Sequence, residues 1–285
     1  MKATQIETLE AYLLESHRDQ TAKSYQYHIG VFLMEHPKAE NYTYQQIISY
    51  LNTVKTNKQI RLASIKRYYD YLLETGQRND HPCKYVKLKD KHKPIQVQNL
   101  FSSTELELLL DRENRYNNLD IRNKVAISLL IYQGLTSEEL INLRTSDVDL
   151  DEGTIYVRRG AKQSARTLPL RTKQIKLFYN YIYESRKALV QTNVDELLIS
   201  IRGVKMSVDG IHSMIQPLQA LYPERALNPL TIRQSVICNL LNERKEPIED
   251  VQMFAGHRWP STTERYKRMD LENQLEEINK WHPLG

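Results

Sequence analysis

The sequence has few cysteines, no long apolar run and no apolar leader. Its two cysteines, Cys83 and Cys238, are far apart, and neither lies in a CxxC or metal-ligand spacing. This excludes a disulfide scaffold and a cysteine-rich zinc site, and it favours a reducing compartment. No apolar run is long enough to span a bilayer, and residues 1–20 contain no apolar signal core. We therefore expect a cytoplasmic protein that makes no use of a membrane.

What the chain does contain fits a globular protein of two domains. It has 285 residues, of which 40% are hydrophobic and 26% charged, so wholesale disorder is not expected. The net charge of +5 is unevenly placed: residues 1–93 hold 15 Lys+Arg and 10 Asp+Glu, whereas the rest of the chain holds 25 of each. A basic domain beside a neutral one is typical of a polyanion-binding arm, and a solvated charged surface is the alternative.

The first domain has helical periodicity throughout. Apolar residues recur at helical spacing within 25–33, 44–51 and 62–73, and Gly76 follows as a plausible helix stop. This part of the sequence contains no strand signal. We predict a small all-helical bundle over residues 1–83.

A lysine-rich segment follows this bundle. Prolines bracket residues 82–94, PCKYVKLKDKHKP, in which five lysines stand against one aspartate. We predict a linker over 84–99 that lies along a phosphate backbone, with merely solvated lysines as the alternative. The lysines predicted to contact DNA are Lys84, Lys87, Lys89, Lys91 and Lys93.

The second domain, predicted over residues 100–285, combines helices with one β signal. A capping sequence, SSTE, precedes its first helix. Residues 124–143 predict one or two apolar helices interrupted by Gly134. Residues 153–159 and 166–170 flank a polar turn, GAKQSA, and predict a β-hairpin. Further helices are predicted at about 172–190, 207–221, 230–242 and 246–255.

Three short segments stand out in this domain. They read GHRWPSTTERY over 256–266, NPLTIR over 228–233 and GLTSEELINLRTSDVD over 134–149. In this order they resemble segments of the tyrosine recombinases, the integrase and Xer-type group. The segments TAKSY, SIKRYYDYLLETG and FSSTELELLL and the predicted hairpin extend the resemblance over nearly the whole chain.

The resemblance implies a fold and a reaction. The fold is mainly α: an N-terminal SAM-like, core-binding helical bundle and a C-terminal mixed α/β catalytic domain with a small antiparallel sheet, which together clamp DNA. The reaction is site-specific recombination or integration of DNA, such as that of a mobile element. In this family a tyrosine attacks the DNA backbone and forms a 3′-phosphotyrosyl intermediate.

This chemistry explains which residue types are needed. A phenol has a pKa near ~10, so attack on a phosphodiester needs a group that takes its proton. Guanidinium groups offset the charge that gathers on the non-bridging oxygens. The leaving 5′-oxygen needs a general acid, which is commonly a lysine in the family. No cofactor, metal or ATP is expected.

Four positions match the catalytic set of the family. Tyr266 matches the nucleophile, Arg233 the second arginine, and His257 the late histidine that hydrogen-bonds the scissile phosphate. Lys162, in the hairpin turn, is the best candidate for the general-acid lysine. The turn itself departs from the usual GKGxKxR pattern.

Two positions depart from the catalytic set. Thr136 follows Gly-Leu where the family has its first arginine, and Leu230 replaces the histidine of His-x-x-Arg. We expect Thr136 to cap a helix and Leu230 to pack in the core. Three arginines are predicted to contact DNA and are candidates to supply the missing charge: Arg144, Arg158 and Arg159.

These departures leave two hypotheses open. The first is an active but atypical recombinase, which the retained Tyr266 favours. The second is a weak or inactive relative that binds DNA as an accessory or partner protein, which the loss of two charged positions favours. A helical protein-interaction module without a DNA role is the remaining alternative, and it predicts no salt-dependent binding to duplex DNA.

The C-terminal tail contains an apolar stripe that indicates a docking partner. Leu271, Leu275, Ile278 and Trp281 form an apolar stripe at helical spacing. The resemblance implies that this exchange helix docks into a neighbouring copy, and docking on its own domain is the alternative. The expected partners are double-stranded DNA in the nucleoid, further copies of the chain in a tetramer on paired sites and, as a further candidate, a second recombinase.

Overall fold

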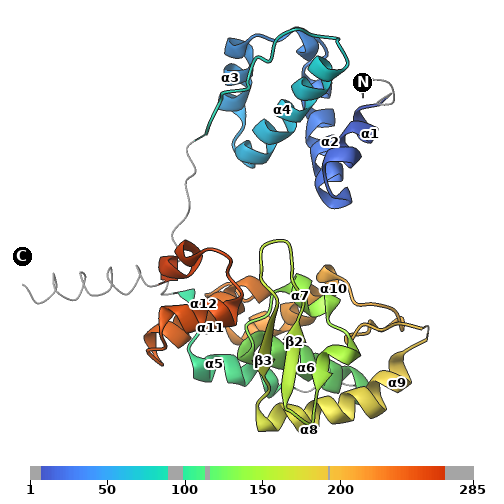
Figure 1. The fold of residues 1–285 in the computed structure, drawn as a ribbon, viewed down its shortest axis with the longest axis vertical. Helices are drawn as coiled ribbons and strands as arrows, with labels where there is room; N and C mark the ends of the chain where they lie inside the picture. The colour runs from blue at the N-terminus through green and yellow to red at the C-terminus, as the bar shows by residue number, and fades with distance from the viewer. Residues whose placement is uncertain (1–7, 89–98, 113–115, 192, 267–285) are drawn as a thin grey trace, which may run out of the picture. The chain divides into compact units, whose positions relative to one another are not determined.

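A computed structural model describes residues 8–88, 99–112, 116–191 and 193–266. The chain divides into two compact units, residues 1–93 and 94–285 (Figure 1). Within the described ranges, no helix is both long and apolar enough to cross a membrane.

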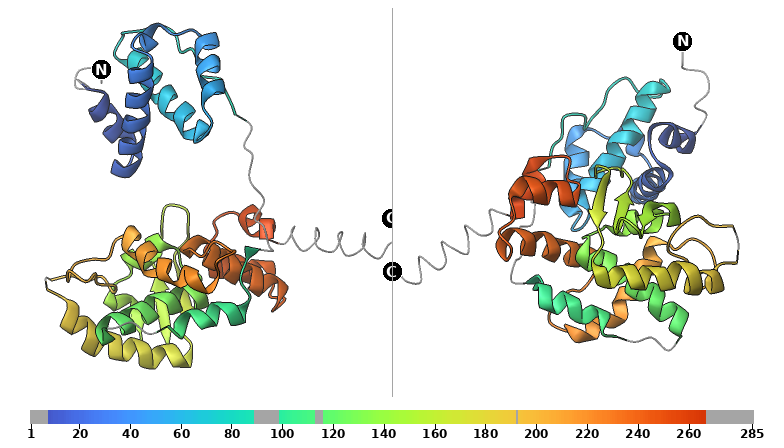
Figure 2. Two further views of the ribbon diagram at one scale, coloured as in Figure 1. Left: turned by 180° about the vertical axis from the view of Figure 1, so that it is seen from behind. Right: turned by 60° about the horizontal axis from the view of Figure 1, so that its bottom comes forward.

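The first unit is a helical bundle, which Figure 2 shows from two further sides. Phe32, Ile47, Ile65 and Tyr69 are fully buried at its centre, because apolar residues at helical spacing bring one face of each helix inward. The Tyr69 hydroxyl donates a hydrogen bond of 2.6 Å to the carbonyl oxygen of Ala39, so this buried polar group is satisfied. The helices are α1 (Leu9–Ser16), α2 (Asp19–Glu35), η1 (Ala39–Asn41), α3 (Tyr44–Thr53) and α4 (Lys58–Glu74).

The start of the lysine-rich segment packs on this bundle. Cys83 and Val86 are buried in its core. The Lys66 ammonium group donates hydrogen bonds to the carbonyl oxygens of Lys84 and Val86, at 3.0 and 2.7 Å. The side chains of Lys84 and Lys87 are exposed. The other predicted DNA-contacting lysines of this segment lie outside the described residues: Lys89, Lys91 and Lys93.

The second unit is built around one buried helix and a three-stranded sheet. In α6 (Asn117–Tyr132) every residue from Val125 to Tyr132 is buried, as expected for a helix that is apolar on all sides. The sheet has the order β1-β2-β3 and is antiparallel, with Ile155 opposite Leu168 in its buried face. The predicted hairpin is thus confirmed, and a short strand at 148–149 adds to its edge.

The elements of the second unit follow the predicted order. They are α5 (Ser103–Glu107), η3 (Leu108–Leu110), α6 (Asn117–Tyr132), α7 (Ser137–Asn142), η4 (Thr145–Asp147), β1 (Val148–Asp149), β2 (Thr154–Val157), β3 (Arg166–Pro169), α8 (Thr172–Asn180), η5 (Tyr181–Ser185), α9 (Arg186–Leu189), α10 (Val208–Ile215), η6 (Gln216–Leu221), α11 (Pro229–Asn242) and α12 (Ile248–Ala255). The mainly α fold class with a small antiparallel sheet is confirmed.

Two tight turns bring the motif segments to the same region. Gly134, with φ of 58°, ends α6 and lets the chain turn into α7. Gly256, with φ of 66°, does the same at the end of α12. Both positions favour glycine because a side chain strains the left-handed backbone region. The turns at 134–136 and 256–257 thereby flank the start of α11.

Candidate functional site

Three of the predicted catalytic residues lie in one cluster of the second unit. Arg233 comes from the first half of α11, His257 follows α12 directly, and Tyr266 is the last residue that the structure describes. The rings of His257 and Tyr266 are stacked, with centroids 6.3 Å apart and planes 13° apart. Burial has the largest influence on the pKa of both residues, and the charge of Arg233 has the second largest. Arg233 therefore lies close to both rings.

Arg233 is a buried cation held by backbone. Its Nη1 donates to the carbonyl oxygen of Gly134 at 2.5 Å, and its Nη2 donates to that of Ala255 at 2.6 Å. Burial lowers the pKa of this guanidinium, while the charge of Glu139 opposes that shift. Arg233 therefore ties the turn after α6 to the end of α12.

Glu139, in α7, is the buried counter-charge. Its Oε2 accepts hydrogen bonds from the N–H and the hydroxyl of Thr136, at 2.8 and 3.0 Å, and lies 3.7 Å from Nη1 of Arg233. Its Oε1 accepts from Nη1 of Arg166 at 2.6 Å. Burial by itself would raise the pKa of this carboxyl, but the hydrogen bonds and the two arginine charges outweigh it and lower the pKa. Glu139 is therefore ionised at neutral pH.

Thr136 caps α7, as expected. Its hydroxyl accepts a hydrogen bond from the N–H of Glu139 at 3.2 Å, and the Glu139 side chain reaches back to the N–H of Thr136. This reciprocal pair satisfies two N–H groups at the start of the helix. A threonine at this position supplies no positive charge.

Arg166 joins the cluster and was not selected from the sequence. It is the first residue of β3, and its Nε donates to the carbonyl oxygen of Phe254 at 2.6 Å. Its Nη2 is buried and has no hydrogen-bond partner. The available signal was the GKGxKxR pattern of the turn, because its final arginine falls on Arg166 when the pattern is placed on residues 160–166.

His257 is neutral at physiological pH. Burial, followed by the charges of Arg233 and Arg166, lowers its pKa to about 4, and only Glu139 acts in the opposite direction. Its Nδ1 lies 2.8 Å from the hydroxyl of Thr263, which fixes the ring. A neutral imidazole in this position can exchange hydrogen bonds with a phosphate oxygen without adding charge.

Tyr266 is buried against apolar residues of α11 and α12. The residues around it include Ile237, Cys238, Val251 and Ala255. Burial raises the pKa of the phenol, and the charge of Arg233 only partly opposes this. A protonated phenol buried in this way cannot reach a DNA backbone, so any attack requires Tyr266 to leave this position first.

The turn that carries Lys162 is joined to the histidine segment. The N–H of Ser164 donates to the carbonyl oxygen of Gly256 at 2.8 Å, and Gln163 pairs with His257 as an antiparallel bridge. Nη2 of Arg258 donates to the carbonyl oxygen of Gly160 at 3.1 Å. Lys162 itself is exposed at the tip of the turn, one residue from Gln163. The hairpin turn and the histidine segment therefore form one structural unit.

The three arginines that were candidates for the missing charge lie at the surface. Arg158 pairs with Asp147 through Nε at 3.0 Å and Nη2 at 2.5 Å. Arg144 and Arg159 are exposed. Arg158 is thus held by a carboxylate of its own, whereas Arg144 and Arg159 remain available to a surface ligand.

The expectation that Leu230 packs in the core is wrong. Its side chain is 63% exposed at the second position of α11. The buried residues on either side of it in this helix are Pro229, Ile232 and Arg233, so the helical period turns Leu230 outward. The position at which the family has a histidine therefore carries an exposed apolar side chain.

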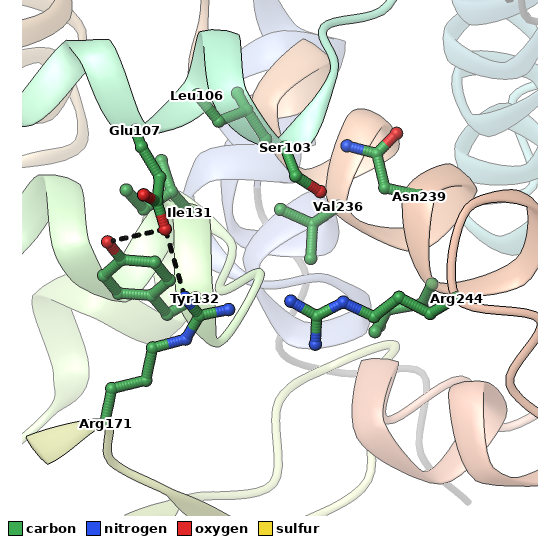
Figure 3. Close-up of a pocket in the computed structure, with 10 residues that line it drawn as sticks. Ser103, Leu106, Glu107, Ile131, Tyr132, Arg171, Val236, Asn239 and Arg244 are labelled. Carbon is green, nitrogen blue, oxygen red and sulfur yellow. Dashed lines mark hydrogen bonds and ion pairs between the residues drawn. The ribbon is translucent and has the colours of Figure 1, made fainter.

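A small cavity lies elsewhere in the same unit. Its volume is about 60 Å³, which admits a few water-sized molecules and not a nucleotide. Figure 3 shows the side chains of Arg171 and Arg244 extending toward it, with Glu107 bonded to Arg171 and to Tyr132. No sequence-predicted site residue lines it. The lining residues are Ser103, Leu106, Glu107, Ile131, Tyr132, Arg171, Val236, Asn239, Leu240 and Arg244.

Comparisons with known proteins agree on one family. The phage integrase family matches residues 99–273 of the chain. The tyrosine recombinase XerD of Proteus mirabilis is 27% identical over 227 residues, which cover 79% of this chain and 71% of the relative. The tyrosine recombinase XerC of Staphylococcus aureus (strain JH9) is 22% identical over 277 residues, which cover 93% of this chain and 91% of the relative.

Solved structures show the same fold. The XerH site-specific recombinase bound to a palindromic difH substrate, a post-cleavage complex, matches with a TM-score of 0.73 at 18% identity and covers 91% of this chain and 79% of its own. A lambda integrase (75–356) dimer bound to a COC′ core site matches with a TM-score of 0.65 at 12% identity and covers 88% of this chain and 89% of its own. The fold of the chain is that of these DNA-bound enzymes.

Proposed function

Because the chain belongs to the phage integrase family, we propose that it is a site-specific recombinase that cuts and rejoins duplex DNA through a 3′-phosphotyrosyl intermediate. The observation that carries this proposal is the convergence of Arg233, His257 and Tyr266 in one buried cluster, from two helices and the segment after them. Residues 1–83 serve as the core-binding domain and residues 100–285 as the catalytic domain.

Each group has a part in the transfer. The Tyr266 phenol releases its proton to solvent, and its oxygen attacks the scissile phosphorus, so that a Tyr266–phosphorus bond forms while the bond to the 5′-oxygen breaks. Lys162 gives a proton to that leaving 5′-oxygen. Arg233 offsets the charge on the non-bridging oxygens, and His257 hydrogen-bonds one of them. Attack by the freed 5′-hydroxyl of a second strand reverses these steps and rejoins the DNA.

Release of Tyr266 from its buried position is the activating step. The phenol is buried among apolar side chains, with the pKa raised by that burial. In the free protein it is therefore protonated and out of reach of DNA. Binding of DNA moves Tyr266 out and brings a phosphate beside Arg233, whose charge then stabilises the phenolate. The buried tyrosine protects the cell's DNA from cleavage outside the assembled complex.

DNA is held mainly through its phosphates. The exposed Lys84 and Lys87 of the first unit and the exposed Arg144 and Arg159 of the second are available for such contacts. We further propose that Lys89, Lys91, Lys93 and Arg158 take part, and that the active form is a tetramer on paired sites. The predicted exchange helix, with Leu271, Leu275, Ile278 and Trp281, would link its copies and lies outside the described residues. Affinity for duplex DNA then falls steeply as salt rises.

One observation favours the alternative of a DNA-binding partner without activity of its own. Thr136 is fully used as a helix cap, and Leu230 is an exposed apolar side chain. Neither residue can offset phosphate charge. In that case a second recombinase would perform the cleavage beside this chain.

The experiment is a trapping assay with nicked suicide duplexes cut from DNA that flanks the gene. We expect a covalent protein–DNA adduct on a denaturing gel, which Tyr266→Phe abolishes. Tyr179→Phe, at an exposed tyrosine in α8, is the matched control and should retain the adduct. Salt-sensitive binding without any adduct, converted to cleavage by Thr136→Arg with Leu230→His, would establish the alternative.

A further inference from the structure

The buried cluster holds more positive than negative charge. Arg166 and Arg233 are both buried, and Glu139 is the one carboxylate that contacts them within the described residues. His257 is neutral beside them. Two like charges in a low-dielectric interior repel each other, and a single carboxylate offsets only one of them. The described cluster is therefore suited to a further anion.

Arg166 has the donor for such an anion. Its Nε and Nη1 are engaged with Phe254 and Glu139, while its Nη2 is buried without a hydrogen-bond partner. An unpaired buried donor is costly, and in native proteins it calls for an explanation such as a ligand. Arg233 differs, because each of its Nη atoms already donates to a backbone carbonyl.

The fold is adapted to keep Arg166 in place. A Cβ atom on Gly256 would lie 2.6 Å from Nη1 of Arg166, so the glycine leaves room for the guanidinium. Two contacts fix both sides of it: the ion pair with Glu139 and the hydrogen bond to Phe254. The adjacent turn is bonded to Gly256 through Ser164. Such a preorganised cation needs little rearrangement when charge develops nearby.

We propose that Arg166 binds the scissile phosphate through its Nη2 and so supplies the guanidinium that Thr136 cannot. This inference rests on the proposed recombinase function. Nη2 of Arg166 donates to a non-bridging oxygen and the charge of Arg233 offsets the charge of the phosphate, while Glu139 keeps both arginines in position.

A binding experiment with inorganic phosphate tests this without cleavage. The full-length protein is titrated with phosphate, and the ring signals of His257, assigned with His257→Gln, are followed by NMR. Removing a charge-assisted hydrogen bond should weaken phosphate binding by about 10- to 100-fold in Arg166→Gln. Adding Thr136→Arg to that variant should recover most of the loss. Arg225→Gln removes an arginine that pairs with Glu105 elsewhere in the unit and should leave phosphate binding unchanged.

A cleavage experiment distinguishes a direct contact between Arg166 and the phosphate from a purely structural role of this residue. On an ordinary scissile phosphate, Arg166→Gln should slow adduct formation by about 10²–10³-fold. On a methylphosphonate, which lacks the negative charge, the same variant should slow adduct formation by less than about 10-fold, because no charge is left to offset. Arg166→Lys keeps the positive charge, so its rate of adduct formation should lie between those of the wild type and Arg166→Gln.

The outcomes separate the two proposals. An absent adduct in the wild type would refute the recombinase function, and the phosphate titration would still decide the role of Arg166. Unchanged phosphate binding in Arg166→Gln, or an absent His257 response in the wild type, would overturn the Arg166 proposal. So would an equal loss of rate on phosphate and methylphosphonate, because it would mark Arg166 as a structural residue.

Discussion

Two glutamates of the second unit each contact two cations, and they differ mainly in burial. Glu139 pairs with Arg166 and Arg233, and these three side chains are 3–7% exposed. Glu107 pairs with Arg171 at 3.1 Å (Figure 3). It also pairs with Lys173 at 3.4 Å, and these three side chains are 39–54% exposed. Water screens the exposed cluster, so its charges act weakly on one another.

Burial gives the same combination of charges a different role. The pKa of His257, beside Glu139, is lowered to about 4. Burial is the largest cause, and the charges of Arg233 and Arg166 follow it. Around Glu107 the arginine lies over the ring of Tyr132, 4.1 Å from its centroid, and the contacts support local packing. The charges of the buried cluster act on one another more strongly than those of the exposed cluster, because solvent screens them less.

The largest expected effect is the loss of the buried carboxylate. Glu139→Gln leaves Arg166 and Arg233 buried without a counter-charge, and this should lower the free energy of unfolding by about 3–5 kcal/mol. Denaturant unfolding of the full chain measures it. A loss below about 1 kcal/mol would mean that the two clusters are energetically alike.

His257 should give the buried cluster a pH dependence of intermediate size. Its pKa is about 4 in the folded protein and 6.5 in the unfolded chain, so between these values the unfolded chain binds a proton that the folded chain does not. The stabilisation is complete above pH 6.5 and is lost as the pH falls toward 4, by about 3 kcal/mol.

The measurement compares unfolding of the wild type and His257→Gln across that range. The variant should lose stability less steeply on acidification, because it has no imidazole to protonate. The charged groups that act on His257 are Arg233, Arg166 and Glu139, and all three remain in the variant. Parallel curves for the two proteins would show that His257 is not held neutral by this cluster.

The smallest expected effect is the loss of the exposed carboxylate. Glu107→Gln removes ion pairs with Arg171 and Lys173 that are screened by water, and the free energy of unfolding should fall by at most about 1 kcal/mol. The change should shrink further at high salt. The same unfolding assay, run at low and high salt, provides the comparison with Glu139→Gln. A loss as large as that of the buried pair would contradict the role given to burial.

The catalytic motifs were recognisable in the sequence, but their environment was not. Tyr266, His257 and Arg233 were selected through the resemblance to the family, and the structure brings them together. Arg166 was overlooked, because a lone arginine at the start of a strand gives little indication of which carboxylate it meets. Leu230 was misplaced, because its apolar character suggested the core, whereas the rotation of α11 exposes it.

The sequence by itself determined the helices, the hairpin, the capped turns and the family, because these depend on local periodicity and on the order of short motifs. Only the tertiary structure decided that Glu139 lies between Arg166 and Arg233, that Tyr266 is buried, and that His257 is neutral. These properties depend on burial and on contacts between residues far apart along the chain. Local patterns carry no information on the distance or the solvent that separates such residues.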